Sequence, residues 1–241
     1  MRTVGLARAL SKLGYCSRSQ AQQLIRAGRV QVKGAVKRNP ETPVYLGRDR
    51  IEVDGGLIRP ARKIYLMLNK PRGLVTTAAD EKGRPTVYSK LHNDLPWLAP
   101  VGRLDKASEG MLLLTNDSEW AARVTAPETH LLKTYHVQVS GVRHAEIPDA
   151  LMKGLRVSSG DFLLVKEARI LRQGNRNTWL TIVLDEGKNR HIRRMLDELG
   201  VEVLRLVRVA IGPLALGDLA KGASRPLSPG EKAALDAAMS K

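Results

Sequence analysis

The sequence of 241 residues is 43% hydrophobic, which is enough for a packed core and too much for a disordered chain. Lys and Arg number 40 against 24 Asp and Glu, a formal net charge of +16, and this favours a polyanionic partner because cations release counterions from phosphates. The single cysteine, Cys16, excludes an internal disulfide and a cysteine-based zinc site, the five histidines lack metal-binding spacing, and no apolar run is long enough to span a membrane.

The amino-terminal residues have the pattern of a small folded module. Apolar residues at helical spacing predict a helix over residues 6–13, which Gly14 ends. The capping-box pattern of residues 17–20 predicts a second helix, which ends at Gly28. Alternating residues at 29–32 and 51–53, each followed by a turn with glycine, predict a small β unit. No signal peptide is evident, so we expect the protein in the cytoplasm.

This module resembles the S4 RNA-binding domain. The resemblance runs from residues 6–10 through 16–21 and 25–34 to about residue 55, with Lys33-Gly34 where the family usually has Asn-Gly. It implies a structured RNA partner, and not a particular reaction. Residues 1–40 agree with it, since they hold nine Lys or Arg and no acid. The side chains expected at the RNA are those of Arg8, Ser17, Arg18, Arg26, Arg29 and Lys33.

A linker at residues 57–63, with Pro60 and three basic residues, divides the chain into domains of residues 1–56 and 64–241. The second domain begins with a buried-strand run over 64–68. Because its strands outnumber its helices and do not alternate strictly with them, we expect an α+β fold with a mainly antiparallel sheet. Further strands are predicted at 111–115, 135–139, 162–170, 178–184 and 201–209, and helices near 118–124, 147–153 and 190–199.

The most informative stretch is a polar, glycine-flanked loop that leads into the apolar strand at 111–115. Loops held by a rigid sheet often carry functional residues. Within Gly102-Arg103-Leu104-Asp105, the carboxylate of Asp105 has Arg103 and Lys106 beside it, and these cations favour its ionised form. On spacing alone an ordinary turn aspartate is the favoured interpretation, because Asp is common in turns.

The same stretch resembles the Gly-Arg-Leu-Asp motif of pseudouridine synthases. Within that superfamily it is most similar to the RsuA-like branch, whose members modify ribosomal RNA and often carry an S4 domain. Other segments fit the family in the right order, so that the likeness covers nearly the whole chain. Residues 68–73 resemble its first motif, 133–137 its tyrosine strand, 186–195 its basic third motif and 225–231 its ending.

The resemblance implies a reaction that cleaves the glycosidic bond of a uridine, rotates the uracil and rejoins it through carbon 5, without a cofactor or a metal. Asp105 is then the catalytic carboxylate, which acts by attack at the sugar, attack at the base or proton removal from the ribose. Tyr135 would lie against the target base, and Arg193 would pair with Asp105. Arg103 would fill the gap that the flipped base leaves in the RNA, and Lys70 would contact RNA.

Each of these roles has a structural alternative. Tyr135 alone fits a half-buried strand tyrosine. Arg193 is spaced for a surface ion pair with Asp197, as Arg194 is with Glu198. Arg103 is equally placed to be a structural partner of Asp105.

The expected partner is ribosomal RNA or a pre-ribosomal particle, bound by a monomer. Residues 100–105 and 190–195 look slightly more like the large-subunit members, which favours large-subunit RNA. A small-subunit enzyme and a non-enzymatic S4 ribosome-binding protein stay open, although the latter leaves the ordered motifs unexplained. An S4-bearing methyltransferase is disfavoured, because Gly55-Gly56 precedes any core strand and fits a cofactor-binding turn poorly.

Overall fold

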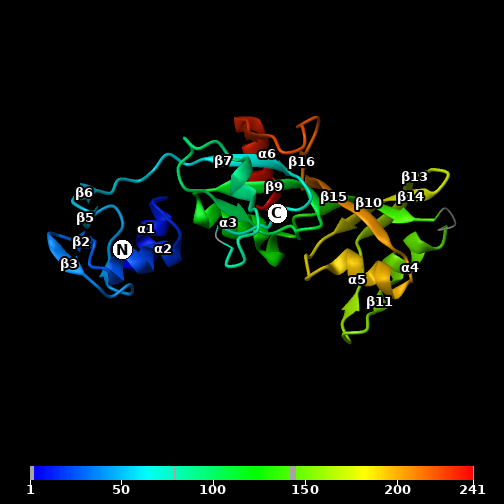
Figure 1. Ribbon diagram of the computed structural model, residues 1–241, viewed down its shortest axis with the longest axis horizontal. Coiled ribbons are helices and arrows are strands. Elements are labelled where there is room, and N and C mark those ends of the chain that lie inside the picture. Colours follow the sequence, from blue (N-terminus) through cyan, green and yellow to red (C-terminus); the bar gives the residue numbers. More distant parts are fainter. Residues whose placement is uncertain (1–2, 79, 142–144, 241) are drawn as a thin grey trace.

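The computed structural model describes residues 3–78, 80–141 and 145–240. Figure 1 shows an elongated molecule, with a small amino-terminal unit at one end and a larger body built on a long twisted sheet. An extended segment after β6 (Gly56–Leu57) connects the two. None of the helices in the described residues is long and apolar enough to cross a membrane.

The amino-terminal unit packs two helices on a small sheet. Leu6, Leu10 and Ile25 are fully buried in its core. The capping box is confirmed, since Ser17 accepts from the backbone N–H of Gln20 and the Gln20 side chain accepts from Ser17. The helices are α1 (Leu6–Lys12) and α2 (Arg18–Arg26), the sheet order is β3-β2-β5-β6 with β2 (Val30–Val32), β3 (Ala35–Lys37) and β5 (Ile51–Val53), and β1 (Val4–Gly5) pairs with β4 (Pro43–Val44).

The large sheet runs in the order β13-β14-β10-β15-β9-β7-β17, and β8 and β16 pair with β9 and β15. Its pairings are antiparallel except where β15 meets β9, so the expected α+β class with a mainly antiparallel sheet is confirmed. The strands are β7 (Tyr65–Lys70), β8 (Ala99–Val101), β9 (Glu109–Thr115), β10 (Lys133–Ser140), β13 (Glu167–Gln173), β14 (Asn177–Leu184), β15 (Val203–Ile211), β16 (Leu214–Ala215) and β17 (Ser224–Pro226).

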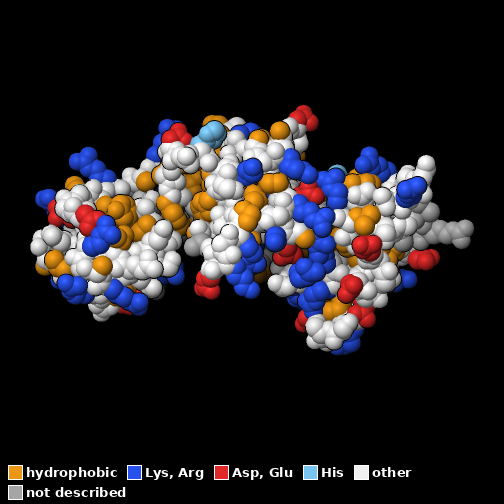
Figure 2. Space-filling view, viewed as in Figure 1, with side chains coloured by type: hydrophobic (Ala, Val, Ile, Leu, Met, Phe, Trp, Pro, Cys, Tyr) orange, Lys and Arg blue, Asp and Glu red, His pale blue; other side chains and the backbone are white. Residues whose placement is uncertain are grey.

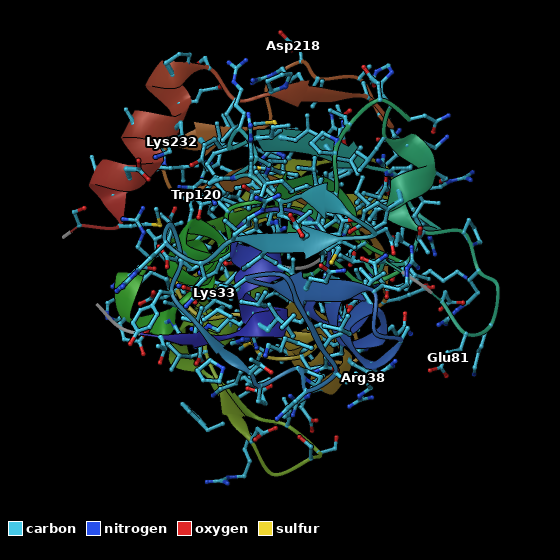
Figure 3. The ribbon with its side chains drawn as sticks, turned by 90° about the vertical axis from the view of Figure 1, so that its left-hand side faces the viewer. Lys33, Arg38, Glu81, Trp120, Asp218 and Lys232 are labelled. Atoms are coloured by element: carbon cyan, nitrogen blue, oxygen red, sulfur yellow. The ribbon has the colours of Figure 1, made fainter. Side chains whose placement is uncertain are left out.

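Both faces of the sheet centre are covered. Leu112 and Leu114 of β9 point into one core, and Met111 and Leu113 into another, because side chains alternate along a strand. The first core packs α4 (Ile147–Lys153) and α5 (His191–Glu198), and the second packs α3 (Ser118–Thr125) and α6 (Pro229–Ala238). In Figure 3, Trp120 of α3 lies near Lys232 of α6, and the Trp120 indole N–H donates to Asp236 at 2.9 Å.

The structure differs from the predicted elements at several points, and the short strands β1, β4, β8, β16 and β17 were not predicted. The single strand predicted at 162–170 is two, β12 (Phe162–Leu163) and β13, and β12 pairs with β11 (Leu155–Arg156) instead of the large sheet. The helix α6 is an addition to the predicted set. Ile58, placed in the predicted linker, donates to the Ile51 carbonyl and packs against the amino-terminal core.

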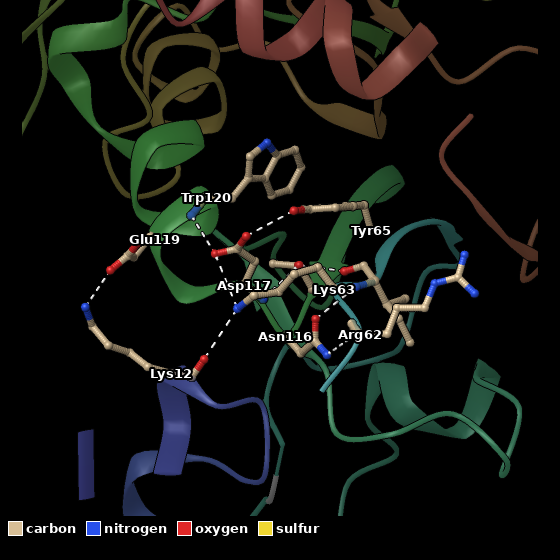
Figure 4. Close-up of polar contacts among 10 residues, drawn as sticks. Lys12, Arg62, Lys63, Tyr65, Asn116, Asp117, Glu119 and Trp120 are labelled. Atoms are coloured by element: carbon tan, nitrogen blue, oxygen red, sulfur yellow. Dashed lines mark hydrogen bonds and ion pairs between the residues drawn. The ribbon is translucent and has the colours of Figure 1, made fainter. Parts of the chain in front are cut away.

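The two units touch through polar contacts at the end of α1, shown in Figure 4. Lys12 forms a 2.5 Å ion pair with Glu119 at the start of α3. The carbonyl of Leu13 accepts from the Ala61 N–H at 3.0 Å. Asn116 donates to the Arg62 carbonyl at 2.9 Å. The connection is therefore anchored on both sides rather than left as a loose tether.

Candidate active site

A cavity of about 400 Å³ lies where the loop before β9, the strands β10 and β15 and the start of α5 meet. Its wall contains Arg103, Asp105, Tyr135 and Arg193, so the structure brings together residues that are far apart in the sequence. Asp105 is the one carboxylate among the described lining residues, and Lys133, Lys188, Arg190 and Arg208 add positive charge. Figure 2 shows Lys and Arg side chains gathered on the face of the large body between α3 and α5.

The loop that carries Asp105 is held through its backbone. The ammonium of Lys70, at the end of β7, donates to the carbonyl oxygens of Asp105 at 3.1 Å and of Ser108 at 2.8 Å. The hydroxyl of Thr76 donates to the Leu104 carbonyl at 2.7 Å. In the described part of the chain no side chain bonds the half-buried carboxylate of Asp105, which is left to face the cavity.

The predicted role of Lys70 is corrected by the structure, because the sequence resemblance implied that this side chain contacts RNA. Its side chain is 0% exposed and its third hydrogen bond goes to the carbonyl of Pro71 at 3.2 Å. Burial lowers the pKa of Lys70 to about 8, although the charges of Asp105 and Glu109 oppose this shift. Lys70 is therefore a structural cation beneath the Asp105 loop, out of reach of RNA in this structure.

Glu109 is a second carboxylate close in sequence to Asp105, and its surroundings are different. Burial favours a raised pKa for Glu109, but hydrogen bonds from Arg205 and Lys221 outweigh it and lower the pKa below its ordinary value. Both carboxylate oxygens accept from Arg205 at 3.0 Å, and Lys221 lies 2.5 Å away. Glu109 does not line the cavity and is fully occupied as a structural ion pair.

Tyr135 is 9% exposed and lines the cavity from β10. Strand alternation explains its direction, since Tyr135, Val137 and Val139 share one face and are all buried in the same core. Its cross-strand neighbours are Ile182 on β14 and Arg208 on β15. The ring thus forms part of the apolar wall opposite the Asp105 loop.

Arg193 lines the cavity without the expected ion pair to Asp105, which is a correction to the sequence prediction. It donates instead to the carbonyl of Ala107 at 3.1 Å, within the Asp105 loop, and to that of Val203 at 3.5 Å. Burial and the charge of Arg190 lower the pKa of Arg193, and the charge of Asp105 opposes this. Arg193 is therefore close enough to Asp105 for an electrostatic interaction, and its contact is with the loop backbone.

The ion pairs that helical spacing predicted on the surface of α5 are absent from the contacts of Arg193 and Arg194, which have other partners. Arg193 reaches the two carbonyls above and not Asp197. Arg194 contacts Asp161 and Ser159 instead of Glu198. Helical spacing alone did not predict these partners, because the loop between β11 and β12 packs against this face of the helix.

Arg208 and Lys133 line the cavity and were missed as site residues from the sequence. Arg208 is 6% exposed, and its Nε donates to the Met111 carbonyl at 2.8 Å. Lys133 donates to the Asp185 carbonyl at 3.2 Å. The available signal was a cation in the core-facing register of a Val- and Leu-rich strand, next to Leu206.

In the amino-terminal unit the residues predicted to contact RNA lie on the surface, and some of them form ion pairs with acidic side chains while others do not. Arg8, Arg18 and Arg26 are exposed, and no ion pair engages them in the described part of the chain. Arg29 pairs with Asp54 at 2.5 Å and Lys33 with Asp49 at 3.0 Å, so their charges are partly neutralised. The Ser17 hydroxyl caps α2. Figure 3 shows Lys33 and Arg38 on the near side of this unit.

The described residues contain no group of three or more His, Cys, Asp or Glu side chains placed to hold a metal ion.

A family model described as RNA pseudouridylate synthase matches residues 64–198, and an S4 domain model matches residues 4–49.

Similar proteins extend over nearly the whole chain. An uncharacterized RNA pseudouridine synthase of Aquifex aeolicus (strain VF5) is 39% identical, over 98% of this chain and 94% of that protein. The ribosomal large subunit pseudouridine synthase B of Bacillus subtilis (strain 168) is 35% identical, over 94% and 93%. A crystal structure of a pseudouridylate synthase aligns with a TM-score of 0.67 and 30% identity, over 96% of this chain and 99% of that one.

Proposed function

The chain belongs to the RNA pseudouridylate synthase family, and from this membership we propose that it isomerises a uridine of ribosomal RNA with Asp105 as the catalytic carboxylate. The observation that carries the assignment is the cavity itself. Asp105 is its one carboxylate within the described residues, it has no side-chain partner there, and Tyr135 and Arg193 stand in the same wall. A carboxylate kept free in this way can act as a nucleophile or as a base.

Other residues that line the cavity have separate roles around the reacting nucleotide. Tyr135 offers an aromatic surface for the uracil, and Arg193 holds the Asp105 loop through the Ala107 carbonyl while contributing positive charge. Arg103 is exposed at the cavity edge, where it can fill the space that the flipped base leaves in the RNA. The Glu109 carboxylate takes no part, because its ion pairs already satisfy it.

We propose large-subunit ribosomal RNA as the substrate. The Bacillus subtilis relative carries that substrate in its name, and the net charge of +16 suits an extended RNA surface. A small-subunit target is the alternative, and mapping decides between them. The enzyme then works as a cytoplasmic monomer, and sedimentation of the purified protein tests that state.

The experiment is chemical mapping of pseudouridine in both ribosomal RNAs, from cells with and without the gene. One site in large-subunit RNA should lose its pseudouridine in the deletion strain and regain it when the gene returns. A lost site in the small-subunit RNA would move the substrate and keep the reaction. Identical maps in the two strains would contradict the proposed function.

Asp105→Asn keeps the size of the side chain and removes its charge, and Asp105→Ala removes the group. Neither variant should form detectable pseudouridine in single-turnover assays, because an amide or a methyl group is neither a nucleophile nor a base here. Both should bind ribosomal RNA about as well as the parent, since affinity comes mainly from cations at phosphates. Asp197→Asn, an exposed carboxylate on α5, is the matched control and should stay active. Robust activity of folded Asp105→Ala protein would refute the assignment.

A further inference from the structure

The guanidinium of Arg208 is buried beneath the cavity with most of its hydrogen-bonding capacity unused. Of the five N–H donors of a guanidinium, only that of Nε has an acceptor among the described residues, the Met111 carbonyl. Nη2 is buried without any partner there, and no ion pair engages Arg208 in that part of the chain. An unsatisfied buried charge is costly, so a group that is absent from the protein itself is expected to complete it.

The strand register around Arg208 directs its side chain toward the cavity. Arg208 lies directly opposite Tyr135, and the register between β10 and β15 shifts just beyond this pair, at Thr134. A bulge of this kind redirects a side chain next to a functional site. On its other side Arg208 pairs with Gly110, where an added Cβ would lie 2.3 Å from the Arg208 carbonyl oxygen. Both features place Arg208 beside Tyr135 rather than in the general core.

The depth of Arg208 decides which part of a nucleotide it meets. Three cations that line the cavity, Arg103, Lys188 and Arg190, are exposed to solvent, where they can meet RNA phosphates. Arg208, at 6% exposure, and Tyr135, at 9%, line the same cavity and are almost fully buried. A flipped nucleotide enters base first and its phosphates stay near the surface. The group that reaches Arg208 is therefore the base.

We propose that Arg208 binds a carbonyl oxygen of the target uracil and stabilises the negative charge of the base when its glycosidic bond breaks. The inference rests on the proposed function. When the bond between C1′ and N1 breaks, its electron pair stays on the uracil and spreads over N1 and the carbonyl oxygens. Carbon 5 then forms the new bond to C1′, loses its proton, and N1 gains one, so no other reactant is needed. A preformed cation at such an oxygen acts most strongly in the transition state.

The neighbouring cation agrees with a site built for negative charge. Burial, followed by the charge of Arg208, lowers the pKa of Lys133, while Asp185 opposes this. Two cations thus stand close together in a half-buried wall, with a backbone carbonyl as the partner of Lys133. Such mutual repulsion is relieved when an anionic group binds between or beside them.

The first test compares Arg208→Met and Arg208→Lys with Arg172→Met, which removes an exposed arginine of β13 on the large sheet. Arg208→Met should lower the single-turnover rate on the mapped ribosomal RNA by roughly 10²–10³, the loss seen for one donor to a developing oxyanion. Most of the loss should appear in the rate and only a smaller part in the apparent affinity for RNA, and Arg208→Lys should recover part of the rate. Thermal unfolding identifies any variant that fails to fold. A folded Arg208→Met protein with the parental rate overturns the proposal.

The second test separates uracil from phosphate. In an Asp105→Asn background, which prevents turnover, binding is measured to an RNA oligonucleotide with the mapped uridine and to its abasic counterpart, which keeps the ribose and phosphates. Arg208→Met should weaken binding to the uridine RNA and leave the abasic RNA unaffected. Equal weakening for both would assign Arg208 to a phosphate and overturn the uracil contact. A parent protein without isomerase activity would instead refute the proposed function.

Discussion

At the scale of single residues, two cations hold the loop that carries Asp105 without bonding its carboxylate. Lys70 and Arg193 both donate to backbone carbonyls of the loop that carries Asp105. Neither occupies the carboxylate oxygens, which stay available for the substrate. The motif pattern predicted that Asp105 and Arg193 meet, and the contact differs because side-chain pairing depends on loop geometry that a sequence does not contain.

Arg193→Met should lower the single-turnover rate at saturating RNA by about 10²-fold, the loss expected when a reacting group shifts by an ångström. The physical reason is the lost bond to the Ala107 carbonyl and the lost positive charge near Asp105. Arg194→Met, one position along α5, removes only the contacts to Ser159 and Asp161 and should cost a few tenths of a kcal/mol in stability, with the rate intact. Equal rates for the two variants would exclude a positioning role for Arg193.

Lys70 gives a prediction about stability and pH. Its pKa of about 8 in the folded protein lies below the ordinary value of 10.5, so the unfolded chain binds more protons between these values. Stability therefore gains a contribution as the pH rises from 8 to 10.5, by at most about 1.4 kcal/mol per pH unit. In urea unfolding, the free energy of unfolding of the parent should rise relative to that of Lys70→Met between pH 8 and pH 10.5. Lys106→Met, an exposed lysine of the same loop, should follow the parent. A constant difference between parent and Lys70→Met would contradict the shifted pKa.

At the scale of elements, β9 is the strand on which the site is built, because it carries the Asp105 loop at one end and is buried on both faces. Gly110 pairs with Arg208 of the neighbouring strand β15. Its φ of 99° lies in the region that favours glycine, and an added Cβ would meet the backbone of Arg208. This contact is between backbones, so the neighbour cannot yield by moving a side chain.

Gly110→Ala should therefore destabilise the fold by about 1–3 kcal/mol from the steric clash, beyond the conformational strain of the positive φ. Gly73→Ala is the matched control. Its φ of 98° is nearly the same, and nothing lies within 4 Å of the added Cβ, so it should show only the strain. Urea unfolding of both variants measures the difference. If Gly110→Ala lowers the free energy of unfolding by no more than Gly73→Ala does, the predicted clash with the backbone of β15 is wrong.

The elements that the sequence predicted are those with local signals. Residue periodicity and the capping box at Ser17 gave α2, and apolar runs gave β9 and β14. The helix α6 was missed although Ser228 and Glu231 form a capping box with a proline at its start, a signal as clear as that of α2. For Arg208 the sequence could show only a cation in a core-facing position, and its direction toward Tyr135 required the structure, since it depends on a bulge between two strands distant in sequence.

At the scale of the whole molecule, the amino-terminal unit lies at one end of the long axis, beside the larger body that carries the cavity (Figure 1). The ion pair between Lys12 and Glu119 and the backbone bond between Leu13 and Ala61 hold the two units together. We therefore expect RNA contacts on the small unit to add to affinity without entering the reaction. Composition indicated a polyanionic partner and the S4 resemblance indicated RNA, while the relative position of the units required the structure.

The two classes of cation on the small unit should contribute unequally to RNA binding. Replacing Arg8, Arg18 and Arg26 by Gln removes three exposed charges without ion-pair partners among the described residues. Each phosphate contact that is lost lowers the salt dependence of log K by about 0.7–0.9, so the slope should fall by roughly 2. Replacing Arg29 and Lys33 by Gln should have less effect per residue, because Asp54 and Asp49 already neutralise part of their charge.

Titration of ribosomal RNA at several salt concentrations measures both slopes, and single-turnover rates at saturating RNA should match the parent in every case. These rates depend on the cavity, which none of the five side chains lines. An unchanged salt slope in the triple variant would place the RNA on another face of the molecule. A reduced rate at saturation would instead mean that the small unit helps to position the target uridine, and that the two units act as one site.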